Sequence, residues 1–320
     1  MTRIQDVYPD DRISLREVGL RDGLQLVKTF PSTAAKQRWI SDEYGAGVRH
    51  FEVGSFLPAS RFPQFADVLD VVRTVAALPG AHGIAPALNE RGVNEALASG
   101  VAEIASVVSA TEEHSQANAN RSREQAIANI RRLCELRDAS PHKPIVNAAI
   151  SMALGCSITG PVDPREVIKL AEKCLAAGVD FVAVADTVGY AGPKQVGELT
   201  RAIVKMSGAK PVCIHLHDTR GMGIANASAA LDAGARILDG SLGGLGGCPF
   251  APGATGNVVF EDLVFLCESK GFAAGIDIEK LVAVRSILES EMPGEPLYGG
   301  LARAGLPGRT SAAEQRARSA

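Results

Sequence analysis

Basic residues are not in excess in this sequence, which contains 33 Lys and Arg against 36 Asp and Glu and has a formal net charge of -3. Aromatic residues are also scarce, at 5%. Nucleic-acid binders usually carry a basic surface, often with aromatic platforms on which bases stack, so we expect no nucleic-acid partner. No apolar run approaches the roughly 20 residues of a membrane span, and the N-terminus lacks a secretory apolar segment. These absences predict a cytoplasmic protein with no membrane partner.

Paired cysteines are missing as well. None of the six cysteines forms a CxxC motif, so the pattern indicates neither a zinc ribbon nor a redox dithiol. The six are Cys134, Cys156, Cys174, Cys213, Cys248 and Cys267. No GxGxxG motif follows the first expected strand, so a Rossmann-type nucleotide site has no support.

What the sequence does contain is a steady alternation of short apolar runs and longer amphipathic segments. The expected strands are Ile13–Val18, Val48–Val53, His82–Ala85, Glu103–Val108, Pro144–Ser151, Phe181–Ala185, Pro211–His217 and Ala235–Ser241. The expected helices between them are Thr33–Tyr44, Phe62–Ala77, Glu90–Ala98, Ser122–Asp138, Pro164–Ala177, Pro193–Met206 and Gly221–Ala233. Repeated strand–helix units predict a parallel sheet, and eight of them fit a closed (β/α)8 TIM barrel of about 250 residues. An open doubly wound sheet is the competing architecture.

The remaining sequence predicts further helices at Val258–Lys270 and Asp277–Glu291, followed by a tail rich in Ala, Arg and Gly. We therefore expect an α/β fold in which residues 1–300 form a single TIM-barrel domain including these C-terminal helices. Residues 301–320 are expected to be a disordered tail.

Polar residues interrupt the apolar pattern at the ends of several expected strands. This is informative because barrel active sites lie at the carboxyl ends of the strands. Arg21 and Asp22 stand where the first strand should end, with Gly23 relieving the turn. A solvated Arg–Asp pair in a surface loop explains these residues equally well. Glu52 and Asp186 are similar polar strand ends, and neither is specific alone.

The seventh strand ends in His215-Leu216-His217-Asp218-Thr219. Residues two apart on a strand face the same side, so both imidazoles should point into the barrel mouth. Two imidazoles on one face favour a metal site over the alternative, two histidines satisfied by hydrogen bonds in the core.

A glycine-rich segment, GGLGGCPFAPGATGN, runs from residue 243 to 257 after the eighth strand. Glycine allows unusual backbone angles and close approach to a ligand. The segment holds Cys248, whose thiol can act as a nucleophile or a proton donor. The alternative is a flexible linker with an incidental cysteine.

Together these motifs resemble the metal-dependent Claisen-type barrels called the DRE-TIM superfamily, whose Asp, Arg and Glu would be Asp22, Arg21 and Glu52. Within it the sequence resembles the 3-hydroxy-3-methylglutaryl-CoA (HMG-CoA) lyase family. The similar segments are EVGLRDGLQ, HFEVGSF, LGC, ADT, HLHDTRGMGIAN and GLGGCPFAPGATGN, which spread from about residue 13 to residue 292.

The resemblance implies a divalent cation, Mg²⁺ or Mn²⁺, held by Asp22, His215, His217 and Asn257. It implies cleavage of the C2–C3 bond of an acyl-CoA substrate to acetyl-CoA and a keto acid. It also implies that the protein is a homodimer. Asp22 and His215 are candidate bases, and Arg21, positioned by Glu52, would stabilise developing charge. Cys248 would protonate the departing enolate, and Asp186 would join the acid–base network.

Two departures from the lyase pattern place the acyl group in question. Residues 157–160, Ser-Ile-Thr-Gly, stand where Pro-Tyr-Glu-Gly is expected, and Ala149 stands where the family pattern has Tyr. A lyase for a related substrate, such as citramalyl-CoA or a longer-branched 3-hydroxyglutaryl-CoA, is therefore an alternative. Further alternatives are a condensing synthase of the isopropylmalate or homocitrate type and a catalytically silent metal-binding protein.

Overall fold

Eight parallel strands close into a barrel in chain order, and β1 pairs with both β2 and β8. The structure, a computed structural model, describes residues 3–247 and 256–307. The strands are β1 (Ser14–Glu17), β2 (His50–Glu52), β3 (His82–Pro86), β4 (Glu103–Ser109), β5 (Ile145–Ser151), β6 (Phe181–Asp186), β7 (Val212–Leu216) and β8 (Ile237–Gly240). All eight expected strands are therefore present, and the TIM barrel is confirmed.

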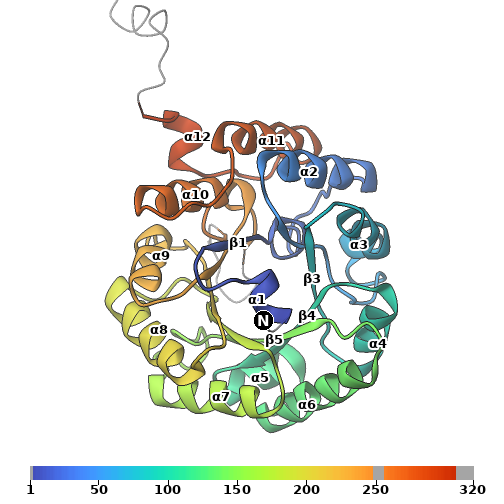
Figure 1. Cartoon of the computed structure of the whole chain (residues 1–320), viewed down its shortest axis with the longest axis vertical. Coiled ribbons are helices and arrows are strands. Elements are labelled where there is room, and N and C mark those ends of the chain that lie inside the picture. Colours follow the sequence, from blue (N-terminus) through green and yellow to red (C-terminus); the bar gives the residue numbers. More distant parts are fainter. Residues whose placement is uncertain (1–2, 248–255, 308–320) are drawn as a thin grey trace, which may run out of the picture.

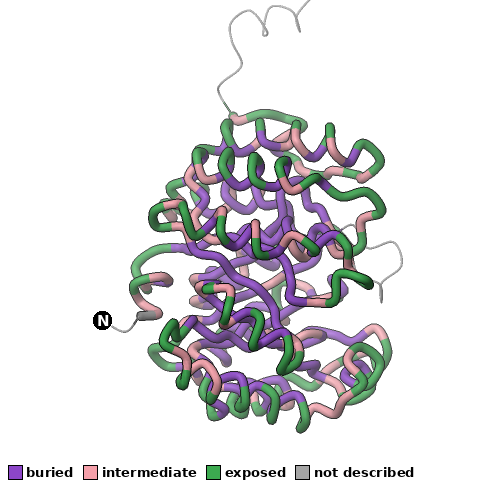
Figure 2. Tube along the Cα trace, turned by 90° about the vertical axis from the view of Figure 1, so that its right-hand side faces the viewer, coloured by how far each residue is buried: buried purple, intermediate pink, exposed green. Residues whose placement is uncertain are grey.

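Helices surround the strands, as Figure 1 shows. They are α2 (Thr33–Ala46), α3 (Val68–Ala76), α4 (Glu90–Ser99), α5 (Glu112–Ala119), α6 (Arg123–Ala139), α7 (Pro164–Ala176), α8 (Pro193–Ser207), α9 (Gly223–Asp232), α10 (Phe260–Ser269) and α11 (Ile278–Glu291). Side-chain caps begin several of them, and Ser122 and Gln125 form a reciprocal capping box at α6. Figure 2 shows the result, a buried interior with exposed residues on the outer turns of the helices. No described helix is both long and apolar enough to span a bilayer.

One expected helix is shorter than its sequence pattern. The segment from residue 62 to 77 begins with a 3-10 turn at Pro63–Phe65, and α3 begins only at Val68. The side chain of Asp67, just before α3, accepts hydrogen bonds from Thr33 and Lys36 of α2. Asp67 makes no capping hydrogen bond to α3, and its carboxylate ties the start of α3 to α2 instead.

Three short helices are not anticipated by the pattern: α1 (Arg3–Val7), α5, and α12 (Gly300–Ala304). The tail expected from residue 301 thus begins as a helix, and that part of the expectation is wrong. The Asp262 carboxylate accepts hydrogen bonds from the backbone N–H of Gly300 and of Leu301, and the Leu301 side chain is buried. Residues 308–320 lie outside the described residues.

The interior of the barrel holds an apolar cluster around Tyr8 and a group of paired charges above it. Tyr8, which follows α1, packs into the floor with Phe181, and its hydroxyl donates to Glu103 Oε2 at 2.7 Å. Above it, Arg16 spans from Glu103 (3.1 Å) to Asp239 (2.6 Å). Buried charges need close partners, and this interior pairs them across strands that are far apart in the sequence.

Candidate active and metal centre

Arg21 and Asp22 lie on a single π-helical turn, η1 (Gly19–Gly23), directly after β1. The backbone N–H groups of Arg21, Asp22 and Gly23 all donate to the carbonyl of Val18, at 3.1, 2.8 and 3.2 Å. A Cβ on Gly19 would lie 2.5 Å from Glu17 Oε1 and 2.7 Å from the Trp39 ring, so only glycine fits there. The turn therefore presents two charged side chains at the barrel mouth.

Three possible metal ligands meet at this mouth. The ligand atoms of Asp22, His215 and His217 all lie within 4.8 Å of one another. Asp22 Oδ2 is 3.9 Å from His215 Nε2 and 3.5 Å from His217 Nε2, and the two Nε2 atoms are 3.2 Å apart. The two histidines do point to the same side of β7, as their spacing predicts.

Asn257 joins this group from the other end of the glycine-rich segment. Its Nδ2 donates to Asp22 Oδ2 at 2.8 Å and to the Leu245 carbonyl at 3.1 Å. Its Oδ1 is buried and has no hydrogen-bond partner among the described residues. A buried, unsatisfied amide oxygen beside a carboxylate and two imidazoles suits a divalent cation.

Arg21 binds two carboxylates at once. Its Nε forms an ion pair with Glu52 Oε2 at 2.7 Å, and its Nη1 donates to Asp22 Oδ1 at 2.6 Å. Burial disfavours the charged form of Asp22, but Arg21 and the interaction with His217 outweigh it and hold the pKa of this carboxyl well below its usual range. The solvated surface pair considered from the sequence is therefore wrong, because half-buried Arg21 and Asp22 form one ion-paired group with the buried Glu52.

Asp186 is buried at the end of β6. Its carboxylate accepts hydrogen bonds from the backbone N–H of Tyr190 (2.9 Å) and of Ala191 (3.0 Å). It therefore shapes the loop that leads to α8. Cys248, the expected proton donor, lies outside the described residues.

The sequence interpretation missed two residues that support the centre, Asp239 and Arg16. Asp239 Oδ2 lies 3.0 Å from His215 Nδ1, and both carboxylate oxygens of Asp239 bind Arg16, at 2.6 and 2.9 Å. The available signal was charged residues inside two otherwise apolar strands, Arg16 and Glu17 in β1 and Asp239 in β8. A strand buried on both faces should otherwise read as continuously apolar.

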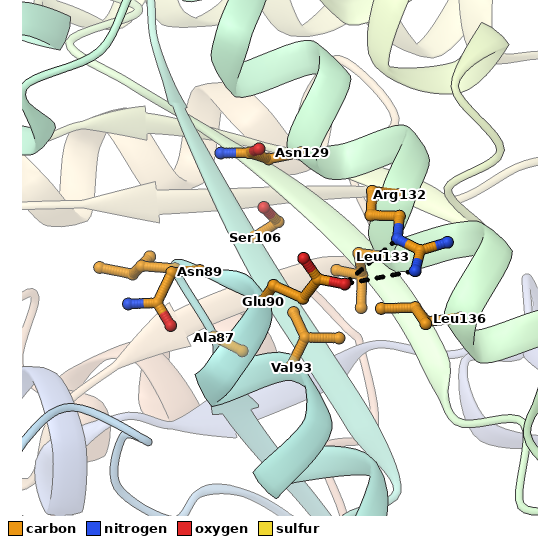
Figure 3. Close-up of a pocket in the computed structure, with 10 residues that line it drawn as sticks. Ala87, Asn89, Glu90, Val93, Ser106, Asn129, Arg132, Leu133 and Leu136 are labelled. Carbon is orange, nitrogen blue, oxygen red and sulfur yellow. Dashed lines mark hydrogen bonds and ion pairs between the residues drawn. The ribbon is translucent and has the colours of Figure 1, made fainter.

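Two cavities lie away from this centre, and neither is a better candidate for the active site. The one in Figure 3 holds about 50 Å³ between α4 and α6, where Glu90 and Arg132 form an ion pair at 3.2 Å. A cleft of about 370 Å³ lies at the barrel floor, beside Arg12, Arg49, His50 and His82. Ligand pockets are typically 300–1,000 Å³, so the first is too small for a substrate. The second lies at the opposite end of the barrel from the clustered ligands.

Comparison with known proteins agrees with the geometry. A family model described as HMGL-like matches residues 12–288. The chain belongs to the HMGL-like family. The relatives of this chain are named as hydroxymethylglutaryl-CoA lyases, and the chain is accordingly a carbon–carbon lyase.

Three relatives show how far the likeness extends. A hydroxymethylglutaryl-CoA lyase of Bacillus subtilis is 33% identical over 91% of this chain and 96% of its own length. A 3-hydroxy-3-isohexenylglutaryl-CoA/hydroxy-methylglutaryl-CoA lyase of Pseudomonas aeruginosa is 37% identical over 85% of this chain and 90% of its own length. A solved HMG-CoA lyase of Acinetobacter baumannii, in complex with coenzyme A and 3-methylmalate, superposes with a TM-score of 0.87 at 32% identity, covering 95% of this chain and 98% of that one.

Proposed function

We propose that this HMGL-like protein is a divalent-metal-dependent lyase that cleaves HMG-CoA to acetyl-CoA and acetoacetate. The observation that carries the proposal is the meeting of Asp22, His215 and His217 at the barrel mouth, with the unsatisfied Asn257 amide oxygen beside them. One carboxylate, two imidazoles and one amide oxygen suit Mg²⁺ or Mn²⁺ and leave coordination positions for substrate oxygens. Such an ion, when bound, polarises the substrate oxygens and eases loss of the hydroxyl proton.

The residues of the chain then have separable roles. Asp22 or His215 accepts the proton of the C3 hydroxyl, and the electrons of the C2–C3 bond move onto the thioester as an enolate. Arg21, fixed by Glu52, stabilises the developing negative charge. C2 of the enolate then takes a proton, which we assign to Cys248 on the family resemblance. Asp186 holds the neighbouring loop in place.

Binding of an acyl-CoA is part of the same proposal. Its support is the related Acinetobacter baumannii enzyme, whose structure contains coenzyme A. A homodimer and a cytoplasmic location stay predictions.

The experiment is a product assay. The purified protein is first stripped with EDTA, reloaded with Mg²⁺ or Mn²⁺, and incubated separately with HMG-CoA and citramalyl-CoA. We expect acetyl-CoA from HMG-CoA only in the reloaded samples, and little from His217→Ala. Full activity in stripped protein would overturn the metal dependence. Cleavage of citramalyl-CoA in place of HMG-CoA would overturn the substrate, and absence of cleavage of either would overturn the lyase proposal.

A further inference from the structure

Solvent reaches the inside of the barrel at a few strand positions only. In the eight strands, partial exposure is confined to His50, Val107, Ala149, Ser151 and His215, and every other strand residue is buried. His50 belongs to the floor cleft. The other four lie in the carboxyl half of their strands, so they mark a space that opens at the mouth.

Their side chains face inward. Asn147 points into the barrel, because its Nδ2 donates to Glu103 Oε1 at 2.6 Å, and Glu103 itself binds Arg16. Strand side chains alternate between faces, so Ala149 and Val107 share the inner face with Asn147 and Glu103. The exposed area of Ala149 and Val107 is therefore exposed to the barrel interior.

The strand register places this space beside the three candidate metal ligands, Asp22, His215 and His217. Val107 pairs with Ala149, Ala149 with Ala183, and Ala185 with His215. Neighbouring strands lie about 4.8 Å apart, so the wall formed by these residues begins one strand away from His215.

Three of the four side chains of this wall are alanines. Layers inside a TIM barrel are normally filled by bulky branched residues. Here Val107, Ala149, Ala183 and Ala185 share the inner face of β4 to β6, and the first two are partly exposed while the two alanines of β6 are buried. We name these four residues the alanine wall. Above it, the hydroxyls of Ser109 and Ser151 are already bonded to each other at 3.2 Å, and Ser109 also binds His114.

We propose that the space at the alanine wall receives the C3 substituent of the substrate and admits hydrocarbon chains longer than a methyl group. The proposal rests on the proposed lyase function, in which the C3 oxygen of the substrate lies at Asp22, His215 and His217. C3 then lies next to the alanine wall, because Ala185 pairs with His215. The four side chains of the alanine wall are apolar, so the wall favours an alkyl or alkenyl chain. The substrate class is then 3-hydroxy-3-alkylglutaryl-CoA, with HMG-CoA as its smallest member.

The test compares kcat/KM for two substrates that differ only at C3, HMG-CoA and 3-hydroxy-3-isohexenylglutaryl-CoA. The wild-type protein should cleave the longer substrate at least as efficiently as HMG-CoA. Ala149→Leu should lower the ratio of long-chain to methyl kcat/KM by about 10- to 100-fold, because each misplaced methylene in a tight apolar pocket costs roughly 10–200-fold. Val107→Ala, which enlarges the space, should raise the ratio.

The matched control is Ala98→Leu, the same change at an exposed position on α4, which should leave both activities unchanged. If Ala149→Leu does not fold, Ala149→Val gives the same comparison with a smaller decrease. A wild-type kcat/KM for the long-chain substrate below that for HMG-CoA would overturn the inference and leave the lyase proposal intact. An equal loss on both substrates in Ala149→Leu or Ala149→Val would also overturn it. Failure to cleave either substrate would instead overturn the proposed lyase function on which the inference rests.

Discussion

Asp239 binds His215 through Oδ2 and Nδ1, 3.0 Å apart, and thereby leaves His215 Nε2 facing Asp22 and His217. Asp239 is in turn fixed by the guanidinium of Arg16, which donates to both carboxylate oxygens. A carboxylate that accepts one ring N–H of a histidine selects the tautomer whose other nitrogen is a free metal ligand. Arg16 and Asp239 pair across the β1–β8 junction that closes the barrel.

We predict that Asp239→Asn weakens Mn²⁺ binding by about 10- to 100-fold, the usual effect of losing a residue that orients a metal-binding histidine. The asparagine amide has one acceptor oxygen where the carboxylate has two, so its NH2 group would face donors, either Arg16 Nε or Arg16 Nη2 and His215 Nδ1. Binding is measured by titration with Mn²⁺, following the EPR signal of the free ion, and the His215 tautomer by ¹⁵N NMR of the metal-free protein.

The matched control is Asp180→Asn, which also removes a carboxylate paired with an arginine, here Arg137 at 2.8 Å, but far from the histidines. It should lower stability and leave Mn²⁺ affinity and the His215 tautomer unchanged. Equal Mn²⁺ affinity in Asp239→Asn and the wild type would show that Asp239 only supports the fold.

Arg21→Lys should reduce kcat by roughly 10²–10³-fold, the range expected when one donor to a developing oxyanion is lost. Arg21 reaches Glu52 and Asp22 with different nitrogens, and the single ammonium of lysine cannot reproduce that fork. Steady-state kinetics with HMG-CoA measures the loss. Arg38→Lys makes the same change in an exposed ion pair with Glu291 and should have no effect. A kcat for Arg21→Lys within about twofold of the wild type would remove Arg21 from the charge-stabilising role.

The strands and the histidine pair could be predicted from the sequence because each depends only on residues close together in the chain. Each strand is a short apolar run, and the spacing of His215 and His217 alone places both on one face. The contact between Arg16 and Asp239 joins residues 223 positions apart, and it exists only because β1 and β8 become neighbours on closure. Local patterns carry no information on that register.

The π-helical turn at Gly19–Gly23 was missed for a related reason. Its shape depends on the Trp39 ring and the Glu17 carboxylate that crowd Gly19, and Trp39 lies on α2. The segment by itself predicts only that a strand ends. Short helices such as α5 are equally hard to anticipate, because eight residues with little apolar periodicity give no helical signal.

A buried carboxyl group should make the stability of the protein fall as pH rises. Glu17 is fully buried, and burial raises its pKa to about 8, although hydrogen bonds from the N–H groups of Gly19 and Leu242 oppose the shift and nearby Glu261 adds to it. The folded protein therefore keeps a proton that the unfolded chain, with an ordinary carboxyl pKa of about 4.3, has already lost. Unfolding releases a proton in this window, so the free energy of unfolding decreases between about pH 4.3 and pH 8.

We accordingly predict that the wild-type Tm falls by a few degrees between about pH 6 and pH 8, and that Glu17→Gln falls less, because its amide does not titrate. Glu289→Gln, at an exposed position on α11, should keep the wild-type slope. Differential scanning calorimetry at several pH values measures the three slopes. Parallel slopes in Glu17→Gln and the wild type would contradict the assignment of the proton to Glu17.

Gly246 lies in the glycine-rich segment beside Asn257 and Asp22, and Gly246→Ala should weaken metal binding more than it lowers stability. Its φ is +120°, and a Cβ there would lie 2.7 Å from Asn257 Nδ2 and 3.3 Å from the Asp22 carbonyl. The methyl group would displace the Asn257 amide from Asp22, so we expect Mn²⁺ affinity to fall by about 10-fold or more. Gly100→Ala is the matched control, because Gly100 has a φ of +75° and a Cβ there meets nothing within 4 Å. Both variants should lose roughly 1–2 kcal/mol of stability from the backbone conformation, and only Gly246→Ala should lose metal affinity. If the two variants bind Mn²⁺ equally well, Gly246 serves the path of the chain alone, and the segment does not hold Asn257 against the cluster.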